Sequence, residues 1–323
     1  MNIGLTFDLR SEYIAEGYSM EESAEFDRED GVEALEHALQ ANGHQTERIG
    51  NIKKLIAQLL EGKRWDLVFN IAEGMYGVGR EAQVPALLDA YNIKYTFSDP
   101  MILSLTLDKA MTKRVVRDFG INTPDFAVIK NEADFATFQL EFPVFVKPLA
   151  EGSSKGIDQS SKVTTIQELQ VVCAKLLTNF NQPVLVEEYL PGREFTVGII
   201  GSENEAKIAG VMEIILLDNA DSNAYAYDNK QHYEDCVEYS IADDVVSEQC
   251  GEMALKVWRA LHCKDAGRVD IRLDKEGKPG FIEINPLPGL HYIHSDLPIM
   301  CRKVGISFNE LIKEIVDSAK KRM

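Results

Sequence analysis

The sequence contains no long hydrophobic run. Its apolar strings, such as Val197–Ile200, are only a few residues long, whereas a helix that crosses a membrane needs about 20 apolar residues. The chain begins MNIGLTFDLR, where a secretory signal would place basic residues ahead of a longer apolar segment. We therefore expect no membrane-spanning helix and a cytoplasmic location.

Cysteine and basic residues are also scarce. The five cysteines form no C-x-x-C pair, and the six histidines show no H-E-x-x-H spacing, which argues against a disulfide framework or a structural zinc site. The 34 Lys and Arg residues face 52 Asp and Glu residues, and the formal net charge is −18. Because such a surface repels nucleic acid and anionic lipid, we expect neither as a partner.

The 323 residues, of which 45% are hydrophobic, suffice for two or three domains. Residues 1–100 alternate short apolar strands, including one expected at Lys94–Phe97, with helical stripes such as Gly31–Asn42. This alternation is typical of a parallel α/β sheet. Farther along, proline-bounded strands and then long hairpin-like strands indicate an α/β fold that is α+β in part. We predict domains at residues 1–100, 101–188 and 189–323.

The most informative polar residues lie in two strands joined by the turn DKEGKPG. Alternation in GRVDIRL turns Asp270 away from its apolar neighbours, and in FIEIN it places Phe281, Glu283 and Asn285 on one face. Carboxylate and amide oxygens side by side suit a hard cation such as Mg²⁺. Polar residues on a half-exposed hairpin are the alternative, but a metal site explains this set of residue types better.

Several weaker signals point to a phosphate or a nucleoside. Lys147 ends an apolar strand and is followed by the small-residue loop Gly152–Gly156, which can present backbone amides to an anion. Lys109 begins a helical segment, and Glu187 and Glu188 end another apolar strand. Taken singly, these features are more often an ordinary turn, a solvated lysine or surface charge.

Taken in order, five motifs resemble a known family. DKAMTK, VKPLAEGSSKG, VEEYLPGREFTVG, GRVDIRL and FIEINPLPG are similar to the ATP-grasp signature of the D-alanine–D-alanine ligases, and the resemblance extends over about Val68 to Ser318. It implies an ATP-grasp fold preceded by a parallel α/β (pre-ATP-grasp) domain. It also implies an ATP-dependent carboxylate–amine ligase that acts through an acyl phosphate, with ATP and Mg²⁺ (or Mn²⁺) as cofactors.

The resemblance implies a role for each matching residue. Those implied to bind ATP are Lys109, Lys147, Ser153, Ser154, Glu187, Glu188, Tyr189, Leu190 and Glu194. Those implied to bind two Mg²⁺ ions are Asp270, Glu283 and Asn285. Those implied in catalysis are Ser153, Lys230, Arg268 and Gly289. Arg268 and the Gly289 amide would stabilise the charged transition state. Lys230, on the long polar segment Asp218–Glu238, would reach the γ-phosphate from a mobile loop that excludes water.

The substrate-facing positions depart from the family pattern. TFDLRSEYIAEGYSMEES replaces a stretch with a glycine pair and an ammonium-binding glutamate, Glu73 stands where the family has a histidine, and LHYIHSDLP is longer than its counterpart. We therefore expect small amino-acid-like substrates other than D-alanine alone.

Two alternatives stay open. In the first, Glu12, Glu16 or Glu73 binds the ammonium, His294 or Ser295 binds the carboxylate, and D-alanine is used. The second is a nucleotide-binding regulator without turnover. The resemblance also allows a homodimer.

Overall fold

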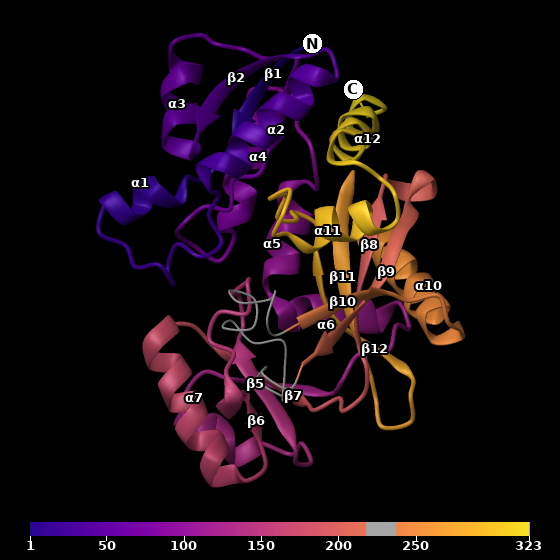
Figure 1. The fold of residues 1–323 in the computed structure, drawn as a ribbon. Helices are drawn as coiled ribbons and strands as arrows, with labels where there is room; N and C mark the ends of the chain where they lie inside the picture. The colour runs from indigo at the N-terminus through magenta and orange to yellow at the C-terminus, as the bar shows by residue number, and fades with distance from the viewer. Residues whose placement is uncertain (218–236, 323) are drawn as a thin grey trace.

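The structure, a computed structural model, describes residues 1–217 and 237–322. Three β-sheets are arranged along the molecule, with the first sheet at one end, the second at the other and the third between them (Figure 1). Lys230 and most of the predicted mobile loop lie outside the described residues.

The first sheet is parallel, as predicted, with strand order β2-β1-β3. Its strands and the helices around it are β1 (Asn2–Thr6), α1 (Arg10–Ala15), α2 (Glu29–Ala41), β2 (Gln45–Gly50), α3 (Ile52–Leu60), β3 (Leu67–Asn70), η1 (Arg80–Ala82) and α4 (Gln83–Ala90). The strand expected at Lys94–Phe97 is wrong: only an isolated bridge joins Tyr95 to Val68. The left-handed φ of 71° at Phe97 turns the chain away from the sheet after that single pairing.

Two helices, α5 (Pro100–Leu107) and α6 (Lys109–Asp118), lead from the first sheet to the second. The second sheet is antiparallel with order β4-β7-β5-β6. Its elements are β4 (Phe126–Ile129), η2 (Glu132–Thr137), β5 (Val144–Pro148), η3 (Gln159–Ser161), β6 (Lys162–Val163), α7 (Ile166–Phe180) and β7 (Val184–Glu188). Alternate strand residues such as Val144, Val146 and Val186 are buried against Leu169 and Leu176 of α7, so one helix covers one face of this sheet.

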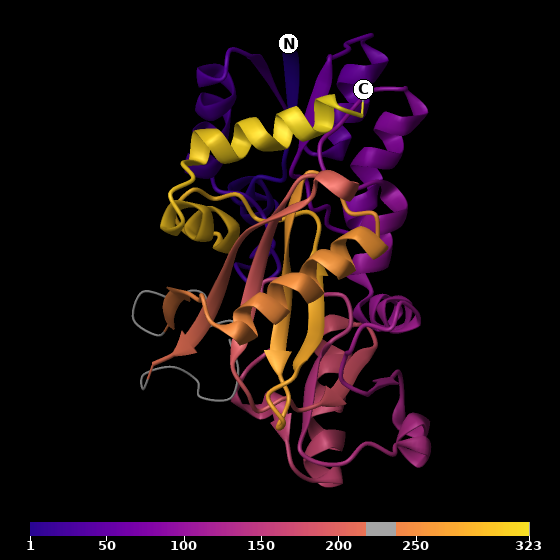
Figure 2. The same cartoon turned by 90° about the vertical axis from the view of Figure 1, so that its right-hand side faces the viewer.

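The third sheet is antiparallel, with order β10-β9-β8-β11-β12. Its elements are β8 (Glu194–Ile200), η4 (Glu203–Glu205), β9 (Lys207–Leu216), β10 (Val237–Ile241), α10 (Val245–Ala260), β11 (Ala266–Leu273), β12 (Pro279–Asn285) and α11 (Asp296–Lys303). Val211 packs in the core formed with α10, whereas its neighbour Met212 packs against Ile299 and Met300 of α11. The two helices therefore cover opposite faces of the sheet; α10 crosses the nearer face in Figure 2.

The hairpin β11–β12 contains an irregularity that the sequence pattern does not reveal. Asp270 pairs with Glu283, but the next residue, Ile271, pairs with Phe281, so Ile282 is left without a cross-strand partner. This β-bulge reverses the alternation and places Phe281 in the apolar core with Ile284. The prediction that Phe281 shares a face with Glu283 and Asn285 is therefore wrong.

The end of the chain returns to the first sheet. Helix α12 (Phe308–Lys320) packs beside α2, as both views show (Figures 1 and 2). Buried Asp265 accepts hydrogen bonds from the Phe97 amide at 2.7 Å and from Arg322 at 2.9 Å. These contacts join segments on either side of the predicted boundaries at residues 100 and 188, which stay predictions. No described helix is both long and apolar enough to span a membrane.

Candidate active site

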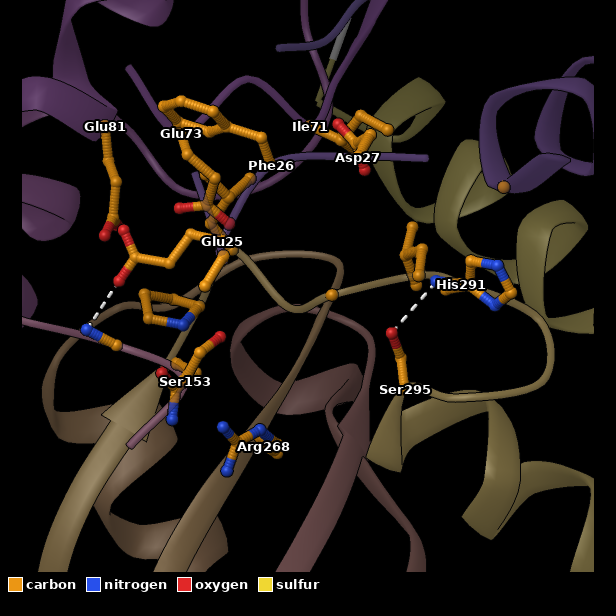
Figure 3. A pocket seen from close by; sticks show the side chains of 18 of the residues that line it. Glu25, Phe26, Asp27, Ile71, Glu73, Glu81, Ser153, Arg268, His291 and Ser295 are labelled. Atoms are coloured by element: carbon orange, nitrogen blue, oxygen red, sulfur yellow. Dashed lines mark hydrogen bonds between the residues drawn. The ribbon is translucent and has the colours of Figure 1, made fainter. Parts of the chain in front are cut away.

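A cavity of about 450 Å³ lies where the parts around the three sheets meet (Figure 3), a size typical of small-molecule sites. Six of the residues predicted from the sequence line it: Lys109, Ser153, Arg268, Glu283, Asn285 and Gly289. They come from α6, from the loop after β5, from the β11–β12 hairpin and from the segment that follows it. The structure thus brings together residues that lie up to 180 positions apart in the sequence.

The small-residue loop Gly152–Gly156 follows strand β5 and borders the cavity. Ser153 and Ser154 both have left-handed backbones, with φ of 50° and 56°, a conformation that serine rarely adopts. The Gly152 amide donates to Glu25 Oε1 at 2.6 Å, and a Cβ on Gly152 would lie 2.6 Å from that same oxygen. A side chain at position 152 would therefore displace the Glu25 carboxylate from this contact.

Glu25, from the segment between α1 and α2, is a functional candidate that sequence reasoning missed. Arg80 and Lys155 both contact its Oε2, at 3.2 and 3.3 Å, and Arg80 also donates to the Ala150 carbonyl at 3.0 Å. Burial alone would raise the pKa of Glu25, but the two cations lower it below its ordinary value. No local pattern marks Glu25 among its acidic neighbours, because its partners are distant in sequence.

Lys147 and Glu187, both predicted for ATP, form a buried ion pair at 2.7 Å. Lys113 of α6, which the sequence analysis did not single out, contacts the same carboxylate at 2.9 Å and donates to Thr123 Oγ1 at 3.0 Å. Burial lowers the pKa of Lys113 to about 8. The two lysines hold the pKa of Glu187 below its ordinary value despite its burial. Two cations therefore converge on one carboxylate beside the small-residue loop.

The residues that follow Glu187 connect the second sheet to the third. The ring of Tyr189 stacks on Phe145 with centroids 6.5 Å apart, and the Lys162 ammonium lies 4.3 Å from the Tyr189 centroid. Leu190 is buried, whereas Glu188 is exposed. From Glu188 to Leu190, this segment therefore offers a solvated carboxylate, an aromatic ring and an apolar side chain in succession.

Two other residues predicted to bind ATP, Ser154 and Glu194, are also absent from the lining of the main cavity. Ser154 borders a much smaller cavity of about 20 Å³ together with Lys109 and Lys147. Glu194, at the start of β8, forms an ion pair with Arg272 at 3.4 Å. Their predicted contacts with the nucleotide stay predictions.

The three predicted metal ligands lie together on the hairpin. Asp270 is directly opposite Glu283, and Asn285 is opposite Arg268. Asp270 Oδ1 accepts from Thr196 Oγ1 at 2.7 Å, and the Asn285 amide nitrogen lies 3.5 Å from Asp270 Oδ2. All three side chains are partly exposed, so their oxygens can reach a ligand.

This donor set fits a hard divalent cation. The proposed set has only two carboxylates, and the described residues contain no group of three or more His, Cys, Asp or Glu residues that could hold a metal. Two carboxylates and one amide oxygen leave positions for water and phosphate oxygens, which is how Mg²⁺ is usually bound. Each of the two carboxylates has a cationic neighbour: Lys109 lies 3.6 Å from Glu283, and Arg268 pairs with Asp270.

Arg268 lies on the far side of the cavity from Glu25 (Figure 3). Besides Asp270, its guanidinium contacts Asp296 at 3.7 Å, and these carboxylates raise its pKa although burial opposes the charge. Gly289, by contrast, is exposed. A Cβ at Gly289 would lie 3.0 Å from Ser295 Oγ, so a side chain there would crowd Ser295.

Another end of the cavity is formed by His291 and Ser295. The His291 amide donates to Ser295 Oγ at 2.9 Å (Figure 3), and His291 Nε2 lies 3.2 Å from Asp30. His294 also lines the cavity. Glu12 and Glu16, which the sequence offered as ammonium ligands, are absent from this lining in the described part of the chain.

Comparison with known proteins agrees with the motifs. A family model described as "D-ala D-ala ligase C-terminus" matches residues 115–317. A D-alanine–D-alanine ligase from Aquifex aeolicus is 36% identical over 285 residues, which cover 88% of this chain and 92% of that protein. The chain belongs to the D-alanine–D-alanine ligase family. It is a ligase that forms carbon–nitrogen bonds, and the predicted family and enzyme class are confirmed.

Solved structures of this family agree with the fold. The D-alanine–D-alanine ligase from Bacillus anthracis has a TM-score of 0.78 at 21% identity and covers 100% of this chain and 98% of its own. The VanG D-Ala:D-Ser ligase from Enterococcus faecalis has a TM-score of 0.75 at 22% identity, with 98% and 99% of the two chains covered. The predicted ATP-grasp fold with a parallel N-terminal sheet is confirmed.

Proposed function

We propose that this protein uses ATP to join the carboxyl group of one amino-acid-like molecule to the amine of another, releasing ADP and phosphate. One observation carries the proposal: Glu283, the cross-strand partner of Asp270, lines the cavity together with Arg268 and with Ser153 of the small-residue loop. This arrangement gathers metal ligands, anion-binding amides and a buried cation around one volume, as phosphoryl transfer requires. Membership of an ATP-dependent ligase family supports it.

The nucleotide binds between the second and third sheets in this proposal. Lys109 and Lys147 contact its phosphates, and the amides of Gly152–Gly156 cover them. The adenine lies along the segment Glu187–Leu190, and Glu194 binds the ribose. Lys230, outside the described residues, is proposed to reach the γ-phosphate.

Asp270, Glu283 and Asn285 would hold Mg²⁺ or Mn²⁺. When bound, the metal would neutralise charge on the phosphate oxygens during transfer. Glu283 contacts Lys109 and Asp270 contacts Arg268, so each carboxylate already lies beside a cationic side chain.

The reaction needs two steps because a carboxylate is a poor electrophile. Transfer of the γ-phosphoryl group to a carboxylate oxygen of the first substrate forms an acyl phosphate and ADP. The amine of the second substrate then attacks the acyl carbon, and the oxygen becomes negatively charged. Arg268 and the Gly289 amide stabilise that oxyanion. Phosphate leaves with its electron pair, the nitrogen loses a proton, and an amide remains.

The substrates are proposed to differ from D-alanine alone. The relatives are named for D-alanine ligation, and one structural neighbour for joining D-alanine to D-serine. In this chain the substrate side of the cavity is formed by the segment Glu25–Arg28, by Glu73 and by the segment His291–Ser295. The second candidate is D-alanine ligation itself, which the family name favours. A cytoplasmic location and a homodimer are further proposals.

A phosphate-release screen tests the function. The purified protein is incubated with ATP, Mg²⁺ and D- or L-amino acids, singly and in pairs, and inorganic phosphate is measured. We expect release that depends on the amino acid and is lost in Glu283→Gln but retained in Glu276→Gln, a matched change in the exposed turn of the same hairpin. Nucleotide binding without amino-acid-dependent release by any pair would favour a regulator and contradict the proposal.

A further inference from the structure

Three carboxylates line the wall of the cavity that faces the first sheet. This carboxylate wall consists of Asp27, Glu73 and Glu81, and Glu25 lies next to it (Figure 3). Glu73 and Glu81 come from the segment after β3, and Asp27 from the segment before α2. Acidic side chains from two separate segments therefore face one volume.

No cation of the described chain lies within ion-pair distance of the carboxylate wall. Neither Glu73 nor Glu81 makes a side-chain hydrogen bond or ion pair with another described residue, and Asp27 Oδ2 is sealed from solvent without a hydrogen-bond partner. The cations that act on it from farther away, Arg10, Arg80 and Lys109, have other contacts. Arg80 contacts Glu25 and the Ala150 carbonyl, Lys109 contacts Glu283, and Arg10 donates to the Ser23 and Ala24 carbonyls.

The titration of these groups agrees with a missing counter-charge. Burial raises the pKa of Glu73 well above its ordinary value, and neighbouring Glu81 and Glu25 raise it further. Burial also raises the pKa of Glu81 to about 7 and that of Asp27 well above the usual range. Buried carboxylates without partners cost free energy. A bound cation would relieve that cost by favouring their ionised forms.

We infer that the amino acid activated at its carboxyl group carries a second cationic group on its side chain, an amine or a guanidinium, which binds at Glu73, Glu81 and Asp27. The inference rests on the proposed function and names the substrate class of the same site. D-Alanine has only its α-ammonium, which can pair with one of the three carboxylates, so the others would be left without a counter-charge.

The position of the wall assigns it to the first substrate. It adjoins Glu25, which accepts from the Gly152 amide of the small-residue loop, and that loop borders the proposed site of phosphoryl transfer. The end of the cavity with His291 and Ser295 offers neutral donors instead, and Arg28 lies there too. Those groups suit the carboxylate of the second substrate. The two ends of the cavity differ in charge and therefore discriminate between the two substrates.

The test compares amino acids that differ only in the terminal amine. Lysine is paired with norleucine and ornithine with norvaline, each as both enantiomers, with glycine or D-alanine as the second amino acid. In separate reactions, either the compared amino acid or the second one is labelled with ¹⁸O in its carboxyl group. A carboxylate oxygen passes to inorganic phosphate only from the molecule that is activated. Kinetics of phosphate release give kcat/KM, and mass spectrometry of the phosphate identifies the first substrate.

We expect one diamino acid to exceed its neutral match by roughly 30-fold or more in kcat/KM, as for a buried charge pair that loses one partner, and to label the phosphate. Glu73→Gln and Glu81→Gln should reduce that ratio toward one, whereas Glu61→Gln, an exposed change on the same domain, should leave it unchanged.

A neutral amino acid that is used as well as its cationic match would overturn the inference, even if the variants failed to fold. So would label arising only from the neutral partner, or a ratio that Glu73→Gln and Glu81→Gln do not change. These outcomes leave the proposed ligase activity intact. The absence of phosphate release with every pair would instead contradict the proposed function.

Discussion

Lys113 and Glu187 form an ion pair at 2.9 Å with both side chains almost completely excluded from solvent. Lys113 lies on α6 and Glu187 at the end of β7, so the pair fixes the helix against the second sheet. Lys113 also lies 3.3 Å from the Phe281 carbonyl of β12, two residues before the proposed metal ligand Glu283. The contact therefore links the proposed nucleotide and metal sites.

Substitutions at the two residues of this ion pair should differ in their effect on the free energy of unfolding. Lys113→Met leaves Glu187 paired with Lys147, whereas Glu187→Gln leaves two buried lysines without their shared counter-charge. We expect Lys113→Met to cost about 1–3 kcal/mol and Glu187→Gln to cost roughly 3–5 kcal/mol. Urea unfolding measures both, with the exposed neighbour Glu188→Gln as a control that should change little. A greater loss in Lys113→Met than in Glu187→Gln would contradict this account.

The metal ligands should be needed for turnover but not for folding. Glu283→Gln and Asn285→Ala remove oxygen ligands from partly exposed positions, so the core around Phe281 and Ile284 is untouched. We expect turnover to fall by several orders of magnitude, because charge on the transferred phosphoryl group loses its stabilisation, with little change in melting temperature. Near-wild-type activity in either purified variant would refute the metal assignment.

Lys147→Ala should weaken ATP binding more than it slows the chemistry. Lys147 is held on a rigid strand by Glu187, and the pKa of its ammonium is raised by that carboxylate against the effect of burial, so it is charged before the nucleotide arrives. We expect the KM for ATP to rise by at least about tenfold, with a smaller change in kcat. Lys175→Ala, an exposed change on α7, serves as the control. An unchanged KM would argue against a phosphate contact.

Glu81 should make stability depend on pH in a defined direction. Burial raises its folded-state pKa to about 7, with Glu25 adding to the shift and Arg80 opposing it. Because the folded state binds this proton more tightly than the unfolded state, stability is lost as pH rises from about 4.5 toward 7. Glu81→Gln should therefore unfold a few degrees above wild type at pH 8 and close to wild type at pH 4.5. A difference of the opposite sign would contradict the assignment.

Much of the fold could be predicted from the sequence. The helical stripe predicted at Gly31–Asn42 corresponds to helix α2, Glu29–Ala41, since its apolar spacing is a local signal. The bulge at Ile282 could not be predicted, because it depends on pairing with β11. The predicted strand near Tyr95 does not form because the backbone at Phe97 is left-handed. A phenylalanine in the sequence does not indicate that conformation.

The candidate site divides in the same way. Asp270, Glu283, Asn285 and Lys147 stand in contiguous motifs, and their spacing carries the chemistry. Glu25 and Lys113 lie in unremarkable local sequence and gain their partners only through tertiary contacts. Glu12, one of the three residues that the sequence offered as an alternative ammonium ligand, instead pairs with Lys54 near the surface. Residues that act through partners distant in the sequence can be identified only in the folded chain.

The stoichiometry of the reaction distinguishes a ligase from an ATPase or a nucleotide-binding regulator. The protein, ATP, Mg²⁺ and the most active amino-acid pair from the phosphate-release screen are incubated, and ADP, phosphate and organic product are quantified together. The account predicts equal amounts of all three, with a product whose mass equals the two amino acids less one water. ADP and phosphate released without a condensed product, or in the absence of any amino acid, would contradict it.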